Sequence, residues 1–175
     1  MCRSRSLRRC PTGIVASVDL EPIIRDGRPG DVEAMGWAGS DAQRDEWRHH
    51  LERGRIGEVD FIVVQVGDEI VGKAVLDWTH NSDGTPWLWL GSVDPAFRGR
   101  GLGGFGLSEA ERRARERGHA IIEMSVDDDN PRARDLYLRN GYSVVGPYLD
   151  VREETLPDGS LVRIETPGWL LRKSL

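Results

Sequence analysis

The sequence predicts a mixed α/β fold, with a central sheet of six to seven mostly antiparallel strands and about four flanking helices. Segments 59–66 and 70–78 are rich in β-favouring residues, and Gly67-Asp68-Glu69 between them is a turn sequence typical of a hairpin. From residue 87 onward the pattern alternates between strands and helices. Antiparallel hairpins followed by such alternation indicate a mixed sheet with helices on both faces.

The first half of the chain adds two helices to this hairpin region. Pro29-Gly30-Asp31 opens a short one. In the next helix Trp47 and Leu51 lie four residues apart and share an apolar face, while the other side is charged. Asn81-Ser82-Asp83-Gly84 is a turn into the third strand of the meander. The expected elements are strand 22–25, helix 29–36, helix 41–53 and strands 59–66, 70–78 and 87–93.

The second half predicts a strand–helix alternation and a closing hairpin. Helix 102–117 has an apolar side and a side of Glu and Arg residues, and Gly118 follows its end. Pro157-Asp158-Gly159 is a turn signal between the last two strands. The expected elements are helix 102–117, strand 120–126, helix 131–139, strand 142–145 and a final strand at 161–165 with 169–171 as its candidate continuation.

Length and charge favour one domain behind a short tail. Residues 1–20 begin with four arginines and no apolar stretch follows, so we expect a disordered basic tail there and a single domain at 21–175. That domain holds 20 of the 24 basic and 28 of the 29 acidic residues, a net charge of −8. An acidic domain opposes general nucleic-acid binding. No apolar run approaches the roughly 18 residues of a membrane span.

Both cysteines, Cys2 and Cys10, lie in the basic tail. The domain therefore offers no thiol for a disulfide, a cysteine-based metal site or a covalent acyl-cysteine intermediate. The four histidines show no metal-ligand spacing, and no metal is expected. The cytoplasm is the expected location.

A glycine-rich loop at 93–104 carries the strongest functional signal. It follows a strand and opens a helix, where unpaired backbone N–H groups and the helix dipole favour an anion. Four glycines lie within 99–104, and Gly106 follows inside the helix, although each glycine costs about 1 kcal/mol there. Arg98 and Arg100 add positive charge. The pattern therefore favours a pyrophosphate-binding loop over a plain turn before a helix.

The same residues also match a dinucleotide-binding motif. Gly99, Gly101 and Gly104 satisfy G-x-G-x-x-G, and Glu123 follows at about the spacing of the acidic residue in that motif. The context argues against it, because hairpins precede the loop and only 71 residues follow Gly104. A dinucleotide-binding oxidoreductase therefore stays a weaker alternative.

Two segments together resemble the GCN5-related N-acetyltransferase (GNAT) family. Arg98-Gly99-Arg100-Gly101-Leu102-Gly103 is similar to its Gln/Arg-x-x-Gly-x-Gly/Ala signature, and the run from Asn130 to Tyr142 is similar to its Asn…Ala…Leu-Tyr…Gly-Phe/Tyr segment. The resemblance covers residues 88–146. It implies that acetyl-CoA is the donor and that an amine is acylated by direct attack. The residues it implies for the donor are Gly91, Ser92, Val93, Arg98, Gly99, Arg100, Gly101, Leu102, Gly103, Gly104, Asn130 and Tyr137.

The resemblance also implies a catalytic acid. Tyr137 occupies the position of a tyrosine that protonates the leaving thiolate, although a core tyrosine would fit the apolar end of its helix as well. Asn130 followed by Pro131 is in addition a good helix N-cap pair, a role compatible with a cofactor contact.

The general base is less well defined. The two positions where family members carry an acid hold Trp87 and Ser125 here. Glu123 lies on the same face of its strand as Ser125 and is the candidate base. The acids at 127–129 are typical of a solvated turn before a helix.

The acceptor is expected to be a small-molecule or peptide amine. The resemblance places its site between segments 30–54 and 146–166, and aromatic and acidic side chains in these segments suit an amine cation. Aminoglycosides, polyamines, amino-acid derivatives and protein N-termini stay open, as do a homodimer and a non-catalytic acyl-CoA-binding module. The side chains concerned are Trp37, Trp47, Tyr148, Asp150, Glu153 and Glu154.

Overall fold

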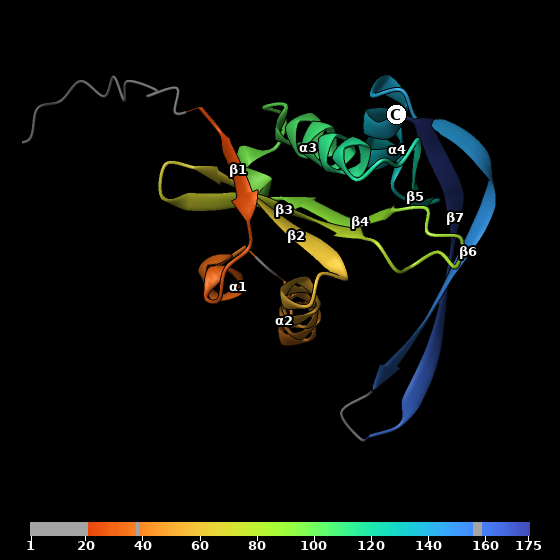
Figure 1. The fold of residues 1–175 in the computed structure, drawn as a ribbon. Helices are drawn as coiled ribbons and strands as arrows, with labels where there is room; N and C mark the ends of the chain where they lie inside the picture. The colour runs from red at the N-terminus through yellow and green to blue at the C-terminus, as the bar shows by residue number, and fades with distance from the viewer. Residues whose placement is uncertain (1–20, 38, 156–158) are drawn as a thin grey trace, which may run out of the picture.

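A seven-stranded mixed sheet organises the chain, in the order β1-β2-β3-β4-β5-β7-β6 (Figure 1). The computed structural model describes residues 21–37, 39–155 and 159–175. The expected tail at 1–20 and turn residues 157 and 158 lie outside these ranges. The strands are β1 (Ile23–Asp26), β2 (Val59–Val66), β3 (Glu69–Asp77), β4 (Trp87–Val93), β5 (Ile121–Asp127), β6 (Ser143–Thr155) and β7 (Leu161–Ser174).

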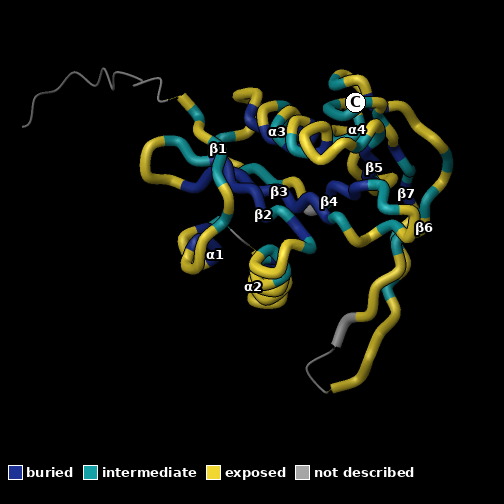
Figure 2. Tube along the Cα trace, viewed as in Figure 1, coloured by how far each residue is buried: buried dark blue, intermediate teal, exposed yellow. Residues whose placement is uncertain are grey.

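Helices cover both faces of this sheet (Figure 1). One face is covered by α1 (Asp31–Ala34) and α2 (Asp41–Arg55), and the other by α3 (Leu102–Glu116) and α4 (Pro131–Arg139). Strand alternation sends Phe61 and Val75 toward α1 and α2, and Ile62 and Leu88 toward α3 and α4. An apolar core results on each face, and Val64, Val71 and Leu102 form a third, smaller cluster. Figure 2 shows the buried residues concentrated along the central strands between the helices.

Strands β4 and β5 form the only parallel pair in the described part of the chain, and their registered pairing is limited to Trp87 with Glu123. Beyond that pair the two strands diverge. On its other side β4 pairs with β3, where Lys73 faces Ser92 but Val75 faces Trp89, so β4 carries one extra residue between them. Such a bulge leaves part of the strand backbone outside the ladder. At the centre of the sheet, the regular pairing of β4 with its two neighbours is therefore interrupted next to residues 90–92.

Strands β6 and β7 form a long hairpin that extends past the body of the sheet on the side of α1 and α2 (Figure 1). Much of the projecting part is exposed (Figure 2). The hairpin is pinned to the sheet through β7, which pairs with β5 from Asp127–Gly168 to Ile121–Ser174. This arrangement brings Tyr148 of β6 against Trp87 of β4, with ring centroids 5.3 Å apart.

The predicted fold class is confirmed, with seven strands and four α-helices in the described residues. The structure differs from the prediction in the lengths of several helices and strands. The first helix is only four residues long, and the final strand is continuous through 169–171 and ends at Ser174. The penultimate strand continues well beyond residue 145, and a short 3-10 helix at Pro95–Phe97 was not predicted. Cross-strand pairing in the hairpin, which local sequence does not reveal, extends these strands.

Candidate active site

A cavity of about 550 Å³ lies on the α3/α4 face, where β4 meets the first turns of these two helices. Its walls bring together most of the residues predicted for the donor, from three separate segments. From the predicted set, the lining includes Gly91, Ser92, Val93, Arg98, Gly99, Gly101, Leu102, Gly103, Gly104, Asn130 and Tyr137. Two predicted residues, Arg100 and Glu123, do not line it.

The glycine loop turns the chain sharply into α3. Gly99 and Gly101 have φ angles of 80° and 81°, in the left-handed region that other residues avoid. Gly101 is the N-cap of α3 and provides no side-chain cap. The first N–H groups of a helix have no partner within it, so the start of α3 presents donors and a positive dipole end to the cavity. This geometry fits an anionic group such as a pyrophosphate.

Gly103 has a different reason to be glycine. A Cβ at this position would lie 2.9 Å from Cδ2 of Leu136, closer than real Cβ contacts allow. At Gly104 a Cβ would lie 3.5 Å from the Asn140 side-chain oxygen. Gly103 therefore leaves room for the Leu136 side chain, and both residues line the cavity.

The arginines that surround the glycine loop are not all the predicted ones. Arg98 lines the cavity and its Nε donates to the Val93 carbonyl oxygen at 3.0 Å. Arg100 instead places its guanidinium over the Phe97 ring, 4.9 Å from the centroid. Arg132 and Arg139 of α4 line the cavity and were missed. Their spacing of seven residues, two helical turns on one face, was the available signal.

Asn130 performs its expected capping role and also lines the cavity. Its Oδ1 accepts a hydrogen bond from the Ala133 N–H at 3.1 Å, and Pro131 occupies the first turn of α4. The cap fixes where α4 begins, and α4 in turn sets the position of Tyr137 two turns later.

Tyr137 points from α4 toward the backbone of β4. A Cβ placed on Gly91 would lie 4.0 Å from the Tyr137 hydroxyl oxygen. Burial raises the pKa of Tyr137 above its ordinary value, and the negative charge of Asp127 adds to the effect. The phenol therefore stays protonated at neutral pH and can donate a proton beside the opened part of β4.

Glu123 lies on the opposite face of β5 from Tyr137, because its neighbours Ile122 and Met124 pack in the α3/α4 core. Its carboxylate is engaged on both oxygens. Oε1 accepts from Arg172 Nε at 2.7 Å, and Oε2 accepts from Asn81 Nδ2 at 3.1 Å. The residue is 7% exposed. Both carboxylate oxygens are therefore already occupied by hydrogen-bond donors, and Glu123 does not line the cavity.

Comparisons with known proteins decide the family. The model of the acetyltransferase (GNAT) family matches residues 27–142. The chain belongs to this family. The dinucleotide-binding alternative is not favoured.

Individual relatives agree with this assignment. A mycothiol acetyltransferase from Streptomyces bingchenggensis is 31% identical over 174 residues, which cover 86% of this chain and 54% of the relative. The chain thus spans about half the length of this curated relative. A ribosomal-protein-alanine N-acetyltransferase from Brucella melitensis has the same fold, with a TM-score of 0.65 at 19% identity over 87% of this chain and 99% of that one. A GNAT acetyltransferase from Streptococcus pneumoniae gives 0.64 at 16% identity, covering 89% and 100%.

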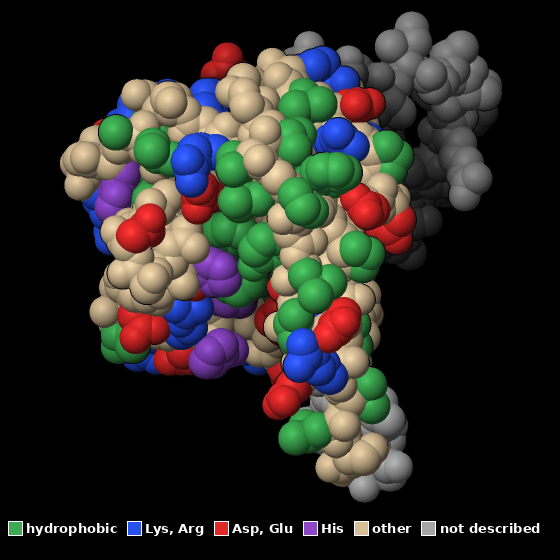
Figure 3. Space-filling model, turned by 90° about the vertical axis from the view of Figure 1, so that its right-hand side faces the viewer, with side chains coloured by type: hydrophobic (Ala, Val, Ile, Leu, Met, Phe, Trp, Pro, Cys, Tyr) green, Lys and Arg blue, Asp and Glu red, His purple; other side chains and the backbone are tan. Residues whose placement is uncertain are grey.

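On the α1/α2 face of this GNAT-family protein, aromatic rings gather beside the gap between β4 and β5. Trp87 is buried, and its ring lies 4.4 Å from that of His80 and 5.3 Å from that of Tyr148. His80 also approaches Trp89, at 4.8 Å between centroids. Figure 3 shows histidine and apolar side chains lining a hollow between the body and the hairpin. The gap in the sheet is thus bordered by aromatic surface on the face opposite the cavity.

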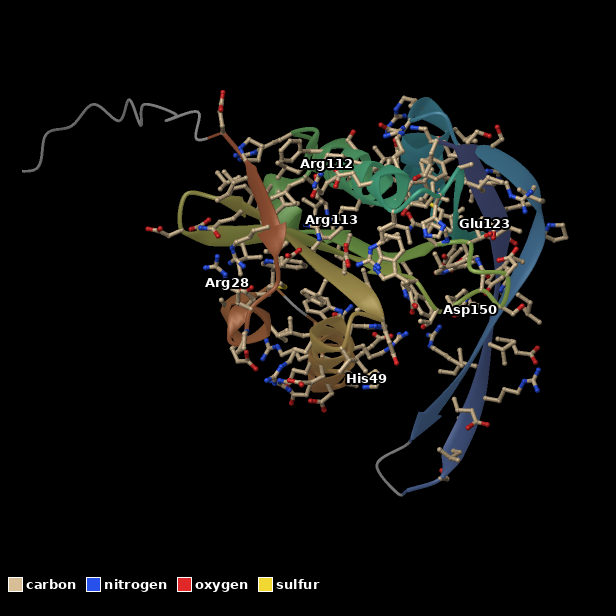
Figure 4. All side chains as sticks on the ribbon, in the orientation of Figure 1. Arg28, His49, Arg112, Arg113, Glu123 and Asp150 are labelled. Carbon is tan, nitrogen blue, oxygen red and sulfur yellow. The ribbon has the colours of Figure 1, made fainter. Side chains whose placement is uncertain are left out.

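Acidic side chains border the same region. In Figure 4 Glu123 and Asp150 lie at the end of the sheet where the hairpin leaves it, whereas His49 lies on α2. Burial raises the pKa of Asp127, and the charges of Asp129 and Asp150 raise it further. Aromatic rings next to carboxylates suit a cationic amine.

A buried lysine lies on the same face of the sheet, under α2. Lys73 is 3% exposed and its Nζ lies 4.3 Å from the centroid of the Trp47 ring, with no hydrogen-bond partner among the described residues. Burial lowers its pKa to about 7. The nearby His50 is also buried, which lowers its pKa to about 4. At neutral pH His50 is therefore uncharged and Lys73 is partly uncharged, which lowers the cost of burying them between the sheet and α2.

Two further properties concern the whole described chain. Within residues 21–37, 39–155 and 159–175, no group of three His, Cys, Asp or Glu side chains is arranged to hold a metal ion. In the same ranges no helix has the length and apolar character needed to cross a membrane.

Proposed function

We propose that the protein transfers the acetyl group of acetyl-CoA directly to a primary amine that enters from the α1/α2 face. The observation that supports this best is the cavity, in which the start of α3, the open part of β4 and the Tyr137 hydroxyl converge. The family implies the donor, and we propose that the amine reaches it between β4 and β5, where the two strands have no registered pair beyond Trp87 and Glu123.

The residues present fit acetyl-CoA. We propose that the backbone N–H groups of 99–104 hold its pyrophosphate, with Arg98, Arg132 and Arg139 adding charge-assisted contacts. The β4 backbone at Gly91–Val93 would pair with the extended pantetheine arm. When bound, acetyl-CoA supplies a thioester carbon open to attack by an amine.

Two features of this chain would promote that attack. The bulge leaves backbone N–H groups of β4 outside the β3 ladder, where they can polarise a carbonyl oxygen. Tyr137 would act as the acid, because its hydroxyl lies beside β4 and keeps its proton at neutral pH. The described part of the chain has no cysteine, and direct attack is therefore the simpler route.

A CoA-release assay over a panel of amines tests this function. The panel contains ethanolamine, glycinamide, glucosamine, spermidine and cysteamine, the last because the curated relative is named for a thiol compound. We expect CoA release with at least one amine at a rate well above that without any amine. Tight binding of acetyl-CoA without amine-dependent release would instead support a non-catalytic acyl-CoA-binding module.

The remaining expectations concern assembly and location. Strand β6 is an edge strand with exposed apolar side chains such as Val145, Leu149 and Val151, which favours a second copy of the chain as a partner. Sedimentation analysis distinguishes a dimer from a monomer. The proposed location is the cytoplasm, which cell fractionation tests.

A further inference from the structure

The transferred amine must lose a proton, and the contacts of Glu123, the predicted base, favour a different residue for this role. Glu123 is enclosed by Arg172 and Asn81. The family-equivalent acid positions hold Trp87 and Ser125, neither of which accepts a proton at neutral pH. These contacts favour a base from another element that reaches the gap between β4 and β5 on the amine side.

His80 is such a group. It belongs to the loop that joins β3 to β4, and its ring packs against both Trp87 and Trp89, 4.4 and 4.8 Å between centroids. These two indoles flank the last registered position of the β4–β5 pair and the start of the bulge. The imidazole remains exposed on its other side. It can therefore touch a substrate in the hollow and pass a proton to water.

The loop is anchored by the residue next to His80. Asn81 Nδ2 donates to the Thr85 carbonyl oxygen at 3.0 Å and to Glu123 Oε2 at 3.1 Å. Arg172 fixes the other oxygen of that carboxylate. Through Asn81, Glu123 thereby ties the loop to β5 and acts as a positioning residue for His80.

The protonation state suits a base. Partial burial against the indoles lowers the pKa of His80 below its ordinary value, so the ring is neutral at pH 7 and has a free lone pair. Among the described residues, four charged groups face the imidazole. The carboxylates of Asp77, Asp150 and Glu123 raise the pKa of His80, whereas the Arg53 guanidinium lowers it. Asp77 forms an ion pair with Arg53 at 2.8 Å.

We propose that His80 is the general base of this acetyltransferase, and this inference depends on the proposed N-acetyl transfer. The amine nitrogen forms a bond to the thioester carbon as the C–S bond breaks. One N–H proton passes to the imidazole of His80, and the sulfur takes the hydroxyl proton of Tyr137. Imidazolium and tyrosinate then exchange one proton each with solvent, and the sum is amine plus thioester giving amide plus thiol.

The test compares His80→Gln with a matched control, His119→Gln. His119 also stacks on an indole, 5.7 Å from Trp78, but lies in the turn before β5. With the most active amine of the panel, we expect His80→Gln to lower kcat by about 10²–10⁴-fold. Its affinity for acetyl-CoA by calorimetry should be unchanged, and the decline of kcat/KM on the acid side, caused by protonation of the imidazole, should disappear. His119→Gln should match the wild type.

A third variant separates the two candidate bases. Glu123→Gln keeps a side-chain oxygen that can accept from Asn81, so kcat should fall by less than about tenfold, while the acid limb of the pH profile is retained. A wild-type kcat in His80→Gln would overturn the inference, as would loss of the acid limb in Glu123→Gln. If no amine supports CoA release even by the wild type, the proposed function fails, and the inference fails with it.

Discussion

The two faces of the sheet differ in how their functional residues are brought together. On the α3/α4 face, the residues predicted to bind the donor come from three short segments, 91–93, 98–104 and 130–139, that follow one another along the chain, and residues of β2 and β3 complete the cavity wall. On the α1/α2 face, His80 comes from a loop, Trp87 and Trp89 from β4, and Tyr148 from the hairpin. The proposed donor site is thus defined mainly by local backbone geometry, and the proposed acceptor side by long-range strand register.

This difference predicts contrasting sensitivities to mutation. Substitutions in the donor segments should change acetyl-CoA binding or the chemical step. Substitutions in the buried layer of the α1/α2 face should change mainly stability. The following predictions test this contrast, from the largest expected effect to the smallest.

Tyr137→Phe should give the largest effect, a fall in kcat of about 10²–10⁴-fold, because it removes the proton donor beside β4. Acetyl-CoA affinity should be nearly unchanged. Since the pKa of Tyr137 is raised, the wild-type kcat should decline only at strongly alkaline pH, once the phenol ionises. Steady-state kinetics across pH measure the loss in the variant and the alkaline decline of the wild type.

The matched control is Tyr142→Phe. The Tyr142 ring packs in the core, with its centroid 6.1 Å from that of the Tyr137 ring. A wild-type kcat in Tyr137→Phe would contradict the acid role.

Gly101→Val should weaken acetyl-CoA binding by about 10–100-fold, which corresponds to losing one charge-assisted hydrogen bond of about 1.5–3 kcal/mol. Valine disfavours a φ of 81°, so the loop would shift away from the anion. Gly118→Val provides the control, since Gly118 has a φ of 85° but lies after the end of α3, outside the cavity lining. Calorimetry should show a loss for Gly101→Val alone; equal losses in both variants would mean that general strain is responsible.

Lys73→Met should increase the free energy of unfolding by about 1–3 kcal/mol at pH 6, because it removes a buried cation without a hydrogen-bonding partner in the described residues. The folded-state pKa of about 7 lies below the ordinary value of Lys, so the unfolded chain binds more protons between these two values. Wild-type stability should therefore rise with pH across that window, and this slope should disappear in the variant. Urea unfolding at several pH values measures it; Lys73→Met less stable than wild type at pH 6 would show that the ammonium has a favourable partner.

Arg132→Ala should give the smallest effect, a loss of acetyl-CoA affinity below about tenfold, since an exposed Arg adds a screened contact to a phosphate. The loss should shrink as salt is added. Arg100→Ala is the comparison, because Arg100 lies over Phe97 and does not line the cavity. Binding measured at two salt concentrations tests the pair, and a larger loss in Arg100→Ala would reverse the assignment.

The sequence predicts the geometry of the proposed donor site well because its signals are local. Positive φ at Gly99 and Gly101, the Asn130 cap and the helix that carries Tyr137 all follow from short-range backbone chemistry. The engagement of Glu123 could not be predicted, because Arg172 reaches it only through the pairing of β5 with β7. Likewise, nothing near His80 in the sequence indicates that its loop folds back over two tryptophans. Scattered histidines become informative only once strand order and register are known.

The most direct test of the central claim is an NMR titration of the wild-type protein with CoA, followed through the backbone amide signals. If the start of α3 holds the pyrophosphate, the largest shifts will fall on residues 99–104, with further shifts along 91–93 of β4 and in α4. Shifts confined to α1, α2 and the β6–β7 hairpin, with the amides of 99–104 unmoved at saturation, would contradict the account.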